Sequence, residues 1–162
     1  MNTRQAAPPV CRECGALHPT YATRDVEIVR RGLKARVPSI SGWFCRECNE
    51  IEFDESTDSL QRWAAAGDDL VIRDRQRAKR LGDRLRRQRR SLNLTPIDAS
   101  ALAGGGHNAF SRYETGSTLP VAAVTTLFSL LELHPELVDE ARRLAQATQI
   151  ELELTDVQTE GG

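Results

Sequence analysis

Hydrophobic and polar positions follow two different periods along the chain. Residues 21–29 and 33–40 alternate loosely between apolar and polar side chains, a pattern with a period of two. This period predicts β-strands, and Arg31-Gly32 predicts the turn that joins them. Ser41-Gly42 predicts a second turn, just before Trp43-Phe44. We therefore expect a small antiparallel sheet in the first third of the chain.

From residue 54 onward, apolar residues recur at spacings of three and four, which predicts helices. Residues 54–69 form an acidic, helix-prone segment that we expect to break at Gly67-Asp68-Asp69. A basic helix is expected over residues 70–90. Gly82 costs that helix about 1 kcal/mol relative to alanine and marks a second candidate break.

The clearest helix start lies at Thr95-Pro96-Ile97-Asp98. Thr95 suits the N-cap, Pro96 the first helical position, and Asp98 the free backbone donors of the first turn. The glycine triplet 104–106 ends this helix, and a short helix is expected over residues 107–114.

Two more helices are predicted, from Pro120 to about Leu133 and from Pro135 onward. The predicted fold class is therefore α+β: a small β-rich N-terminal module followed by an all-α domain of five helices.

Composition places the chain among ordinary soluble proteins, with 40% hydrophobic and 28% charged residues. It has no apolar run long enough to span a membrane. Residues 1–10 are polar and do not resemble a secretory signal, so we expect a cytoplasmic protein. In that reducing compartment, paired cysteines are more often metal ligands than disulfides.

The net charge of −1 hides an uneven distribution of charge. Residues 73–90 hold ten basic and two acidic side chains, a local charge of +8, whereas residues 132–162 carry −6. A concentrated basic segment in a nearly neutral chain indicates a localised site for a polyanion. The alternative is an ordinary solvated helix face.

All four cysteines occur in two CxxC pairs that are 30 residues apart. Two such turns place four thiolates around one cation, which suits structural Zn²⁺ and leaves no coordination position for water. A redox-active pair and an iron–sulfur cluster are the competing interpretations, and His18 is a candidate spare ligand. The expected ligands are Cys11, Cys14, Cys45 and Cys48.

The short helix at residues 107–114 is the expected recognition helix. Phe110 and Tyr113 are expected to face the core, which leaves other side chains exposed to the major groove. Arginine pairs with guanine and asparagine with adenine, so Arg112 and Asn108 are the candidate base contacts. In the alternative interpretation Asn108 is only the N-cap of the helix, and Arg112 is either a surface residue or a partner of Glu114.

Other side chains near this helix are candidates for contacts with the DNA backbone, which position the protein without reading the sequence. They are Arg84, Arg87, Arg90 and Ser111.

These sites complete the predicted α+β fold: a small zinc-bound β-rich N-terminal module followed by an all-α five-helix helix-turn-helix domain. The expected divisions are a disordered N-terminus, the zinc-binding module, the DNA-binding domain and an acidic tail, over residues 1–10, 11–68, 69–147 and 148–162.

The string GGGHNAFSRYETG, at residues 104–116, resembles the C-terminal domain of MqsA/YgiT-type antitoxins, within the Xre/Cro-like helix-turn-helix class. His134-Pro135-Glu136-Leu137 is similar to the final helix of that family. The two CxxC pairs and Gly42-Trp43-Phe44-Cys45 resemble its N-terminal module. The resemblance covers residues 11–143.

This resemblance implies an antitoxin of a type II toxin–antitoxin pair that also represses its own transcription. It implies that the zinc module binds a RelE-like ribonuclease toxin. It also implies a homodimer that binds a palindromic operator in double-stranded DNA through Asn108 and Arg112. One departure is Pro96, where many relatives in the wider class carry a glutamine that can anchor to phosphate.

The alternatives to this function are a stand-alone regulator and an enzyme. A stand-alone zinc-containing transcription regulator would use the same DNA chemistry without a toxin. An enzyme is disfavoured, because the sequence offers no nucleophile–base pairing, and its glycine triplet lacks the lysine of a phosphate-binding loop.

Overall fold

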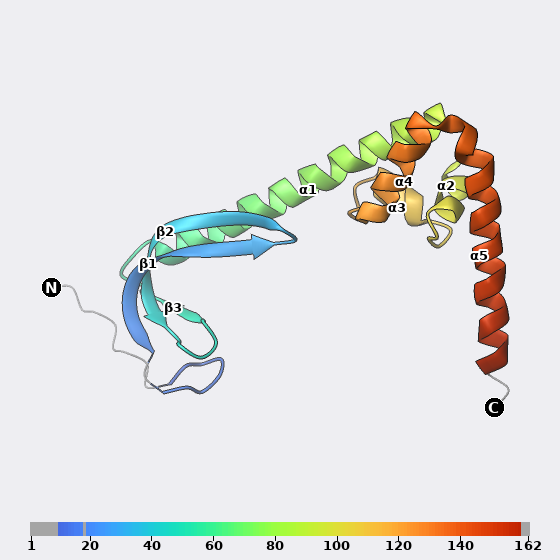
Figure 1. Cartoon of the computed structure of the whole chain (residues 1–162). Coiled ribbons are helices and arrows are strands. Elements are labelled where there is room, and N and C mark those ends of the chain that lie inside the picture. The colour runs from blue at the N-terminus through green and yellow to red at the C-terminus, as the bar shows by residue number, and fades with distance from the viewer. Residues whose placement is uncertain (1–9, 18, 160–162) are drawn as a thin grey trace. The chain divides into compact units, whose positions relative to one another are not determined.

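A computed structural model describes residues 10–17 and 19–159. The chain divides into two compact units, with the boundary between Asp74 and Arg75. The first contains a three-stranded antiparallel sheet, and helices follow it, as Figure 1 shows. The predicted order of a β-rich module before helices is thus confirmed. The disorder expected for residues 1–10 and the ligand role considered for His18 concern positions outside the described residues, except for Val10.

Strands β1 (Thr20–Arg30) and β2 (Leu33–Phe44) form a long hairpin. At the turn, Arg31 and Gly32 have φ angles of 47° and 79°. Positive φ at both central residues belongs to the tight turn whose twist matches that of paired strands. The turn predicted at Arg31-Gly32 is therefore confirmed.

The turn predicted at Ser41-Gly42 is wrong, because β2 runs straight through these residues to Phe44. Gly42 pairs there with Phe53 of the short strand β3 (Ile51–Phe53). A Cβ at Gly42 would lie 2.5 Å from the carbonyl oxygen of Glu52. The glycine therefore allows a close approach of β3 and does not mark a turn.

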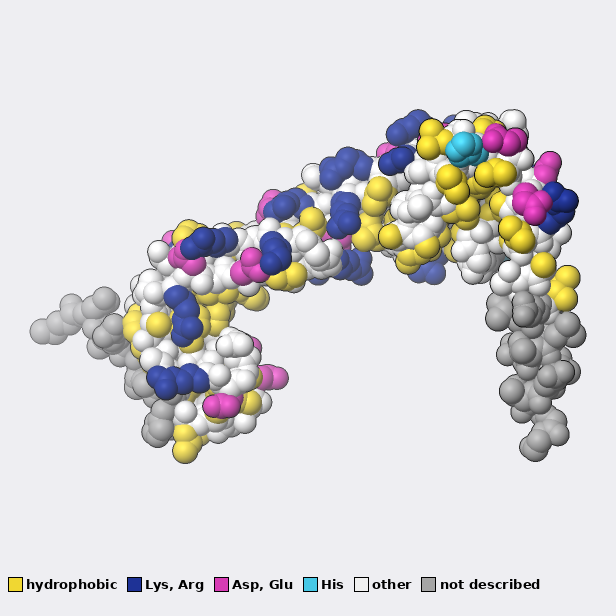
Figure 2. All heavy atoms as spheres, in the orientation of Figure 1, with side chains coloured by type: hydrophobic (Ala, Val, Ile, Leu, Met, Phe, Trp, Pro, Cys, Tyr) yellow, Lys and Arg dark blue, Asp and Glu magenta, His cyan; other side chains and the backbone are white. Residues whose placement is uncertain are grey.

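Helix α1 (Ser59–Ser91) is continuous, so both predicted breaks are wrong. A glycine such as Gly67 destabilises a helix by only about 1 kcal/mol relative to alanine. A helix of 33 residues can form in spite of this cost. At Gly82, a Cβ would lie 2.2 Å from the carbonyl oxygen of Tyr113. Glycine is needed there because the backbone of another helix passes close by. Lysine and arginine side chains crowd along α1 (Figure 2).

The second unit adds α2 (Pro96–Leu102), α3 (Ala109–Glu114), α4 (Ala122–Leu133) and α5 (Val138–Thr159) to the end of α1. A 3-10 turn, η1 (Pro135–Leu137), precedes α5. The predicted set of five helices is present. Among the described residues, no helix is both long and apolar enough to span a membrane.

The core of this unit is built by apolar side chains from α1 to α5. Phe110 and Phe128, both fully buried, lie 4.7 Å apart between ring centroids. Their neighbours in the core are Leu85, Leu92, Leu94, Ala99, Leu102, Val124, Leu131 and Val138.

Candidate metal centre and nucleic-acid interface

The two CxxC turns have the same backbone geometry. The N–H of Cys11 donates to the carbonyl of Ala16 at 2.8 Å, and the N–H of Cys45 donates to the carbonyl of Glu50 at 2.9 Å. Each turn then passes through a left-handed residue, Gly15 in the first and Asn49 in the second. Glycine and asparagine adopt this conformation at the least cost. Asn49 is the counterpart of Gly15, a correspondence that the sequence analysis missed.

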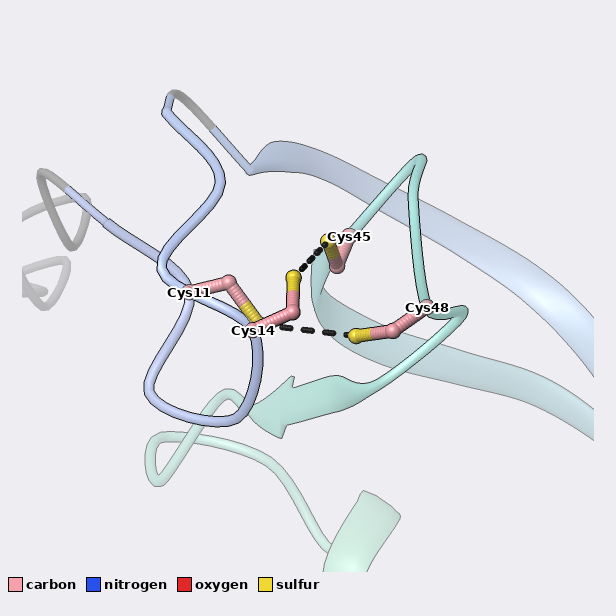
Figure 3. Close-up of side chains that lie close together, drawn as sticks. All are labelled: Cys11, Cys14, Cys45 and Cys48. Carbon is pink, nitrogen blue, oxygen red and sulfur yellow. Dashed lines mark hydrogen bonds between the residues drawn. The ribbon is translucent and has the colours of Figure 1, made fainter.

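These turns bring four thiols together (Figure 3). The Sγ atoms all lie within 4.8 Å of one another, with 3.7 Å between Cys11 and Cys48 and 3.6 Å between Cys14 and Cys45. None of the four is in a disulfide. A tetrahedron with metal–sulfur bonds of about 2.3 Å has edges of about 3.8 Å. The cluster therefore fits a single metal ion.

The electrostatics of the cluster fit a cation as well. Backbone N–H groups of Cys48 and Glu47 point at the sulfur of Cys45 and lower its pKa to about 7. A hydrogen bond from the backbone of Glu50 lowers the pKa of Cys48, but desolvation and the three neighbouring thiols raise it by more. The net result is a pKa of about 12 for Cys48. Four clustered thiols cannot all ionise without a cation, because the thiolates repel one another. A bound cation offsets this repulsion.

The start of α2 in the second unit is capped as predicted. Thr95 Oγ1 accepts from the N–H of Asp98 at 3.1 Å, and Asp98 Oδ2 accepts from the N–H of Thr95 at 3.0 Å. Pro96 occupies the first turn. The hydroxyl and backbone N–H of Thr95, and then the charge of Arg142, lower the pKa of Asp98.

The turn between α2 and α3 is held by Ser100, which is 2% exposed. Its hydroxyl donates to the carbonyl of His107 at 3.3 Å and accepts from the N–H of Phe110 at 3.1 Å. Gly104 provides the left-handed conformation that reverses the chain. The glycine triplet therefore acts as predicted, and a buried hydroxyl fixes where α3 begins.

Helix α3 has the two faces that the sequence predicts. Phe110 is fully buried and Tyr113 packs against the core. Asn108 and Arg112 are exposed one turn apart, with a hydrogen bond between their backbones. Ser111, a candidate backbone contact, is also exposed.

Two bonds that the alternative considered, a cap from the Asn108 side chain and a pair between Arg112 and Glu114, are absent among the described residues, and Arg112 is an exposed surface residue. Asn108 occupies the N-cap position of α3, but its side chain makes no capping bond; its Oδ1 lies 3.4 Å from Nδ1 of His107. Glu114 does not pair with Arg112. Its carboxylate, which is nearly buried, accepts from Arg89 at 2.5 Å and from Arg86 at 3.3 Å.

The basic segment of α1 therefore divides into structural and available arginines. Arg86 and Arg89 hold Glu114. Arg84 donates to Ser129 Oγ at 3.0 Å but stays exposed. Within the described part of the chain, the exposed side chains of Arg87 and Arg90 have no hydrogen-bond or ion-pair partner. The charge pattern of the sequence did not distinguish the arginines that pair with Glu114 from those that remain available. The acidic Glu114 within the GGGHNAFSRYETG string was the one indication that some of them would form ion pairs inside the fold.

Comparison with known proteins bears on both sites together. A family model described as the antitoxin component of bacterial toxin–antitoxin systems, MqsA, matches residues 10–142, which include all four cysteines and α3. The Antitoxin MqsA of Escherichia coli (strain K12) is 33% identical over 136 residues, which make up 83% of this chain and 98% of that relative. The resemblance drawn from the sequence is thus confirmed, and the chain belongs to the MqsA family of antitoxins.

Proposed function

We propose that this antitoxin is also a sequence-specific repressor of its own transcription. The observation that carries the proposal is the pair Asn108 and Arg112, exposed on one face of α3 while Phe110 on the other face is buried. The second helix of a helix-turn-helix enters the major groove with such a face. Membership of the antitoxin family implies a toxin partner and favours this function over a stand-alone regulator.

Recognition of DNA would combine two kinds of contact. Arg112 is suited to guanine O6 and N7, and Asn108 to adenine N6 and N7. Contacts with the DNA phosphates would position the helix without reading the sequence. They would also make the affinity for DNA depend on salt concentration. The residues proposed for these contacts are Arg84, Arg87, Arg90 and Ser111. A homodimer would place two such helices in the half-sites of a palindromic operator, about one helical turn apart.

The four cysteines are proposed to hold structural Zn²⁺. Zinc accepts four thiolates in a tetrahedron, and a shell closed in this way supplies folding free energy rather than an activated water. The function is accordingly proposed to be non-enzymatic. A cytoplasmic location would keep the thiols reduced and able to bind the metal.

The partner is proposed to be a RelE-like ribonuclease toxin, bound by the first unit. Purified full-length chain, mixed with the toxin encoded beside its gene, is expected to elute as one complex in size-exclusion chromatography. Separate elution of the two proteins would refute the proposed partner.

DNA binding is tested by fluorescence anisotropy on the duplex upstream of the chain's own gene and on a scrambled duplex of equal length. Arg112→Ala is expected to weaken operator binding by about 1–3 kcal/mol and to change scrambled binding little. Arg87→Ala should weaken both and reduce the salt slope by about one. Arg46→Ala, an exposed arginine of the first unit, is the control. Unchanged operator binding by Arg112→Ala would overturn the recognition assignment.

A further inference from the structure

A groove of about 380 Å³ opens beside the thiol cluster in the first unit. Two of the cysteines line it together with residues of β2, β3 and the start of α1. It is not part of the metal site, because the cysteine ligands point toward one another (Figure 3). The groove is thus a surface that the proposed metal leaves free.

The floor of the groove is apolar and preformed. Trp43, Ile51, Phe53 and Leu60 contribute to its lining. Trp43 is 3% exposed and packs edge-on against Tyr21, with 5.2 Å between ring centroids. Leu60, in the first turn of α1, is 49% exposed. A rigid aromatic base with an exposed leucine at its edge is typical of a pocket that receives an apolar anchor.

The rim of the groove is acidic. Glu50, Glu52 and Glu55 line it against a single arginine, Arg12, which pairs with Glu52 at 3.1 Å. The segment over residues 47–58 carries six acidic side chains and no lysine or arginine. Two of the three rim carboxylates are therefore left without a cation from the lining, and they favour a partner segment of positive charge.

We propose that this groove is the docking site for a basic, amphipathic segment of the partner toxin. An apolar side chain of that segment would seat against Trp43 and Leu60, and lysine or arginine side chains beside it would meet Glu50 and Glu55. The inference rests on the proposed function, because it names where and by what chemistry the toxin binds.

The test measures binding of the purified toxin to full-length, zinc-loaded chain by isothermal titration calorimetry. Leu60→Asp is expected to raise Kd by about tenfold or more through loss of the apolar anchor. Aspartate suits the first turn of a helix, so α1 should still form. The double variant Glu50→Lys/Glu55→Lys is expected to raise Kd by about tenfold at low salt, with a smaller effect at high salt.

Matched controls make the same kinds of substitution at exposed residues that do not line the groove. Leu17→Asp and Val29→Asp alter side chains that are 71% and 58% exposed. The double variant Asp68→Lys/Asp69→Lys reverses two exposed charges on α1, the same change in charge as in the double groove variant. These variants are expected to bind within about twofold of the unmodified chain. Zinc content and far-UV circular dichroism confirm that each variant is folded.

The outcomes separate the two proposals. Groove variants that bind as tightly as the controls would overturn the docking site while leaving the toxin partnership intact. Loss of binding in Val29→Asp alone would place the toxin on the edge strand β1 instead. An unmodified chain that does not bind the toxin would refute the proposed partner itself, and the docking site with it.

Discussion

Glu114 at the end of α3 and Arg89 of α1 are joined by a hydrogen bond of 2.5 Å between Oε1 and Nε. The same arginine donates to the carbonyl of Leu94 at 2.7 Å. Both side chains are largely buried, at 7% and 11% exposure. Because Arg112 lies two residues before Glu114, this pair helps to set the direction in which α3 presents the side chain of Arg112.

Removal of the carboxylate should therefore destabilise the helical unit. Glu114→Ala would leave Arg89 buried without its partner, and we expect a loss of about 3 kcal/mol in the free energy of unfolding, measured with urea. Glu140→Ala removes an exposed carboxylate that pairs with Arg143. It should cost less than about 1 kcal/mol. Equal losses in the two variants would contradict a structural role for Glu114.

Two glycines of α1 should respond to alanine in opposite directions. Gly82→Ala places a Cβ against the backbone of Tyr113, and overpacking of this kind costs about 1–3 kcal/mol. Gly67→Ala meets nothing within 4 Å and should stabilise α1 by up to about 1 kcal/mol. Thermal unfolding followed by circular dichroism measures both. A stabilising Gly82→Ala would show that the helices do not approach as described.

The cap of α2 should make stability depend on acid pH. Thr95 lowers the pKa of Asp98 in the folded chain below the ordinary value of 3.8 for this carboxyl group. The cap therefore stabilises the fold above the ordinary carboxyl pKa, and this contribution is lost as the pH falls through the lowered pKa. Asp98→Asn should be less stable than the unmodified chain at pH 7, and the difference should shrink below about pH 4. A difference that stays constant with pH would contradict the charge-dependent cap.

Metal removal should affect the first unit selectively. Both tryptophans of the chain, Trp43 and Trp63, lie in that unit, each against another aromatic ring. Chelation of zinc, or Cys14→Ser, is expected to change tryptophan fluorescence strongly while far-UV circular dichroism keeps most of its helical signal. Metal affinity should also fall at lower pH, because the thiols must lose protons to bind.

The control for this experiment is Arg46→Ala, which changes an exposed residue inside a CxxC turn and removes no ligand. It should keep its zinc and its fluorescence. If tryptophan fluorescence is the same with and without the metal, the cluster does not support the fold of the first unit.

Much of the site was predictable because its signals are local. The two CxxC pairs needed only their spacing to indicate a metal centre, and the thiols lie within 4.8 Å of one another. The exposed face of α3 followed from helical periodicity, since Phe110 and Tyr113 take the opposite face. The roles of the individual arginines of α1 could not be predicted in this way. Helical periodicity gives the face on which an arginine lies but not which residue of a distant segment packs against that face.

Some features depend only on neighbours within a few residues and could be predicted from the chain: the turn at Arg31-Gly32, the cap at Thr95 and Asp98, and both CxxC turns. Other features became visible only in the folded protein, namely the need for glycine at positions 42 and 82 and the identity of the cations that pair with Glu114. The two groups differ in the range of the interactions involved. Dihedral preferences and capping bonds act along the chain, whereas steric contact and ion pairing depend on distances that exist only once remote segments have packed together.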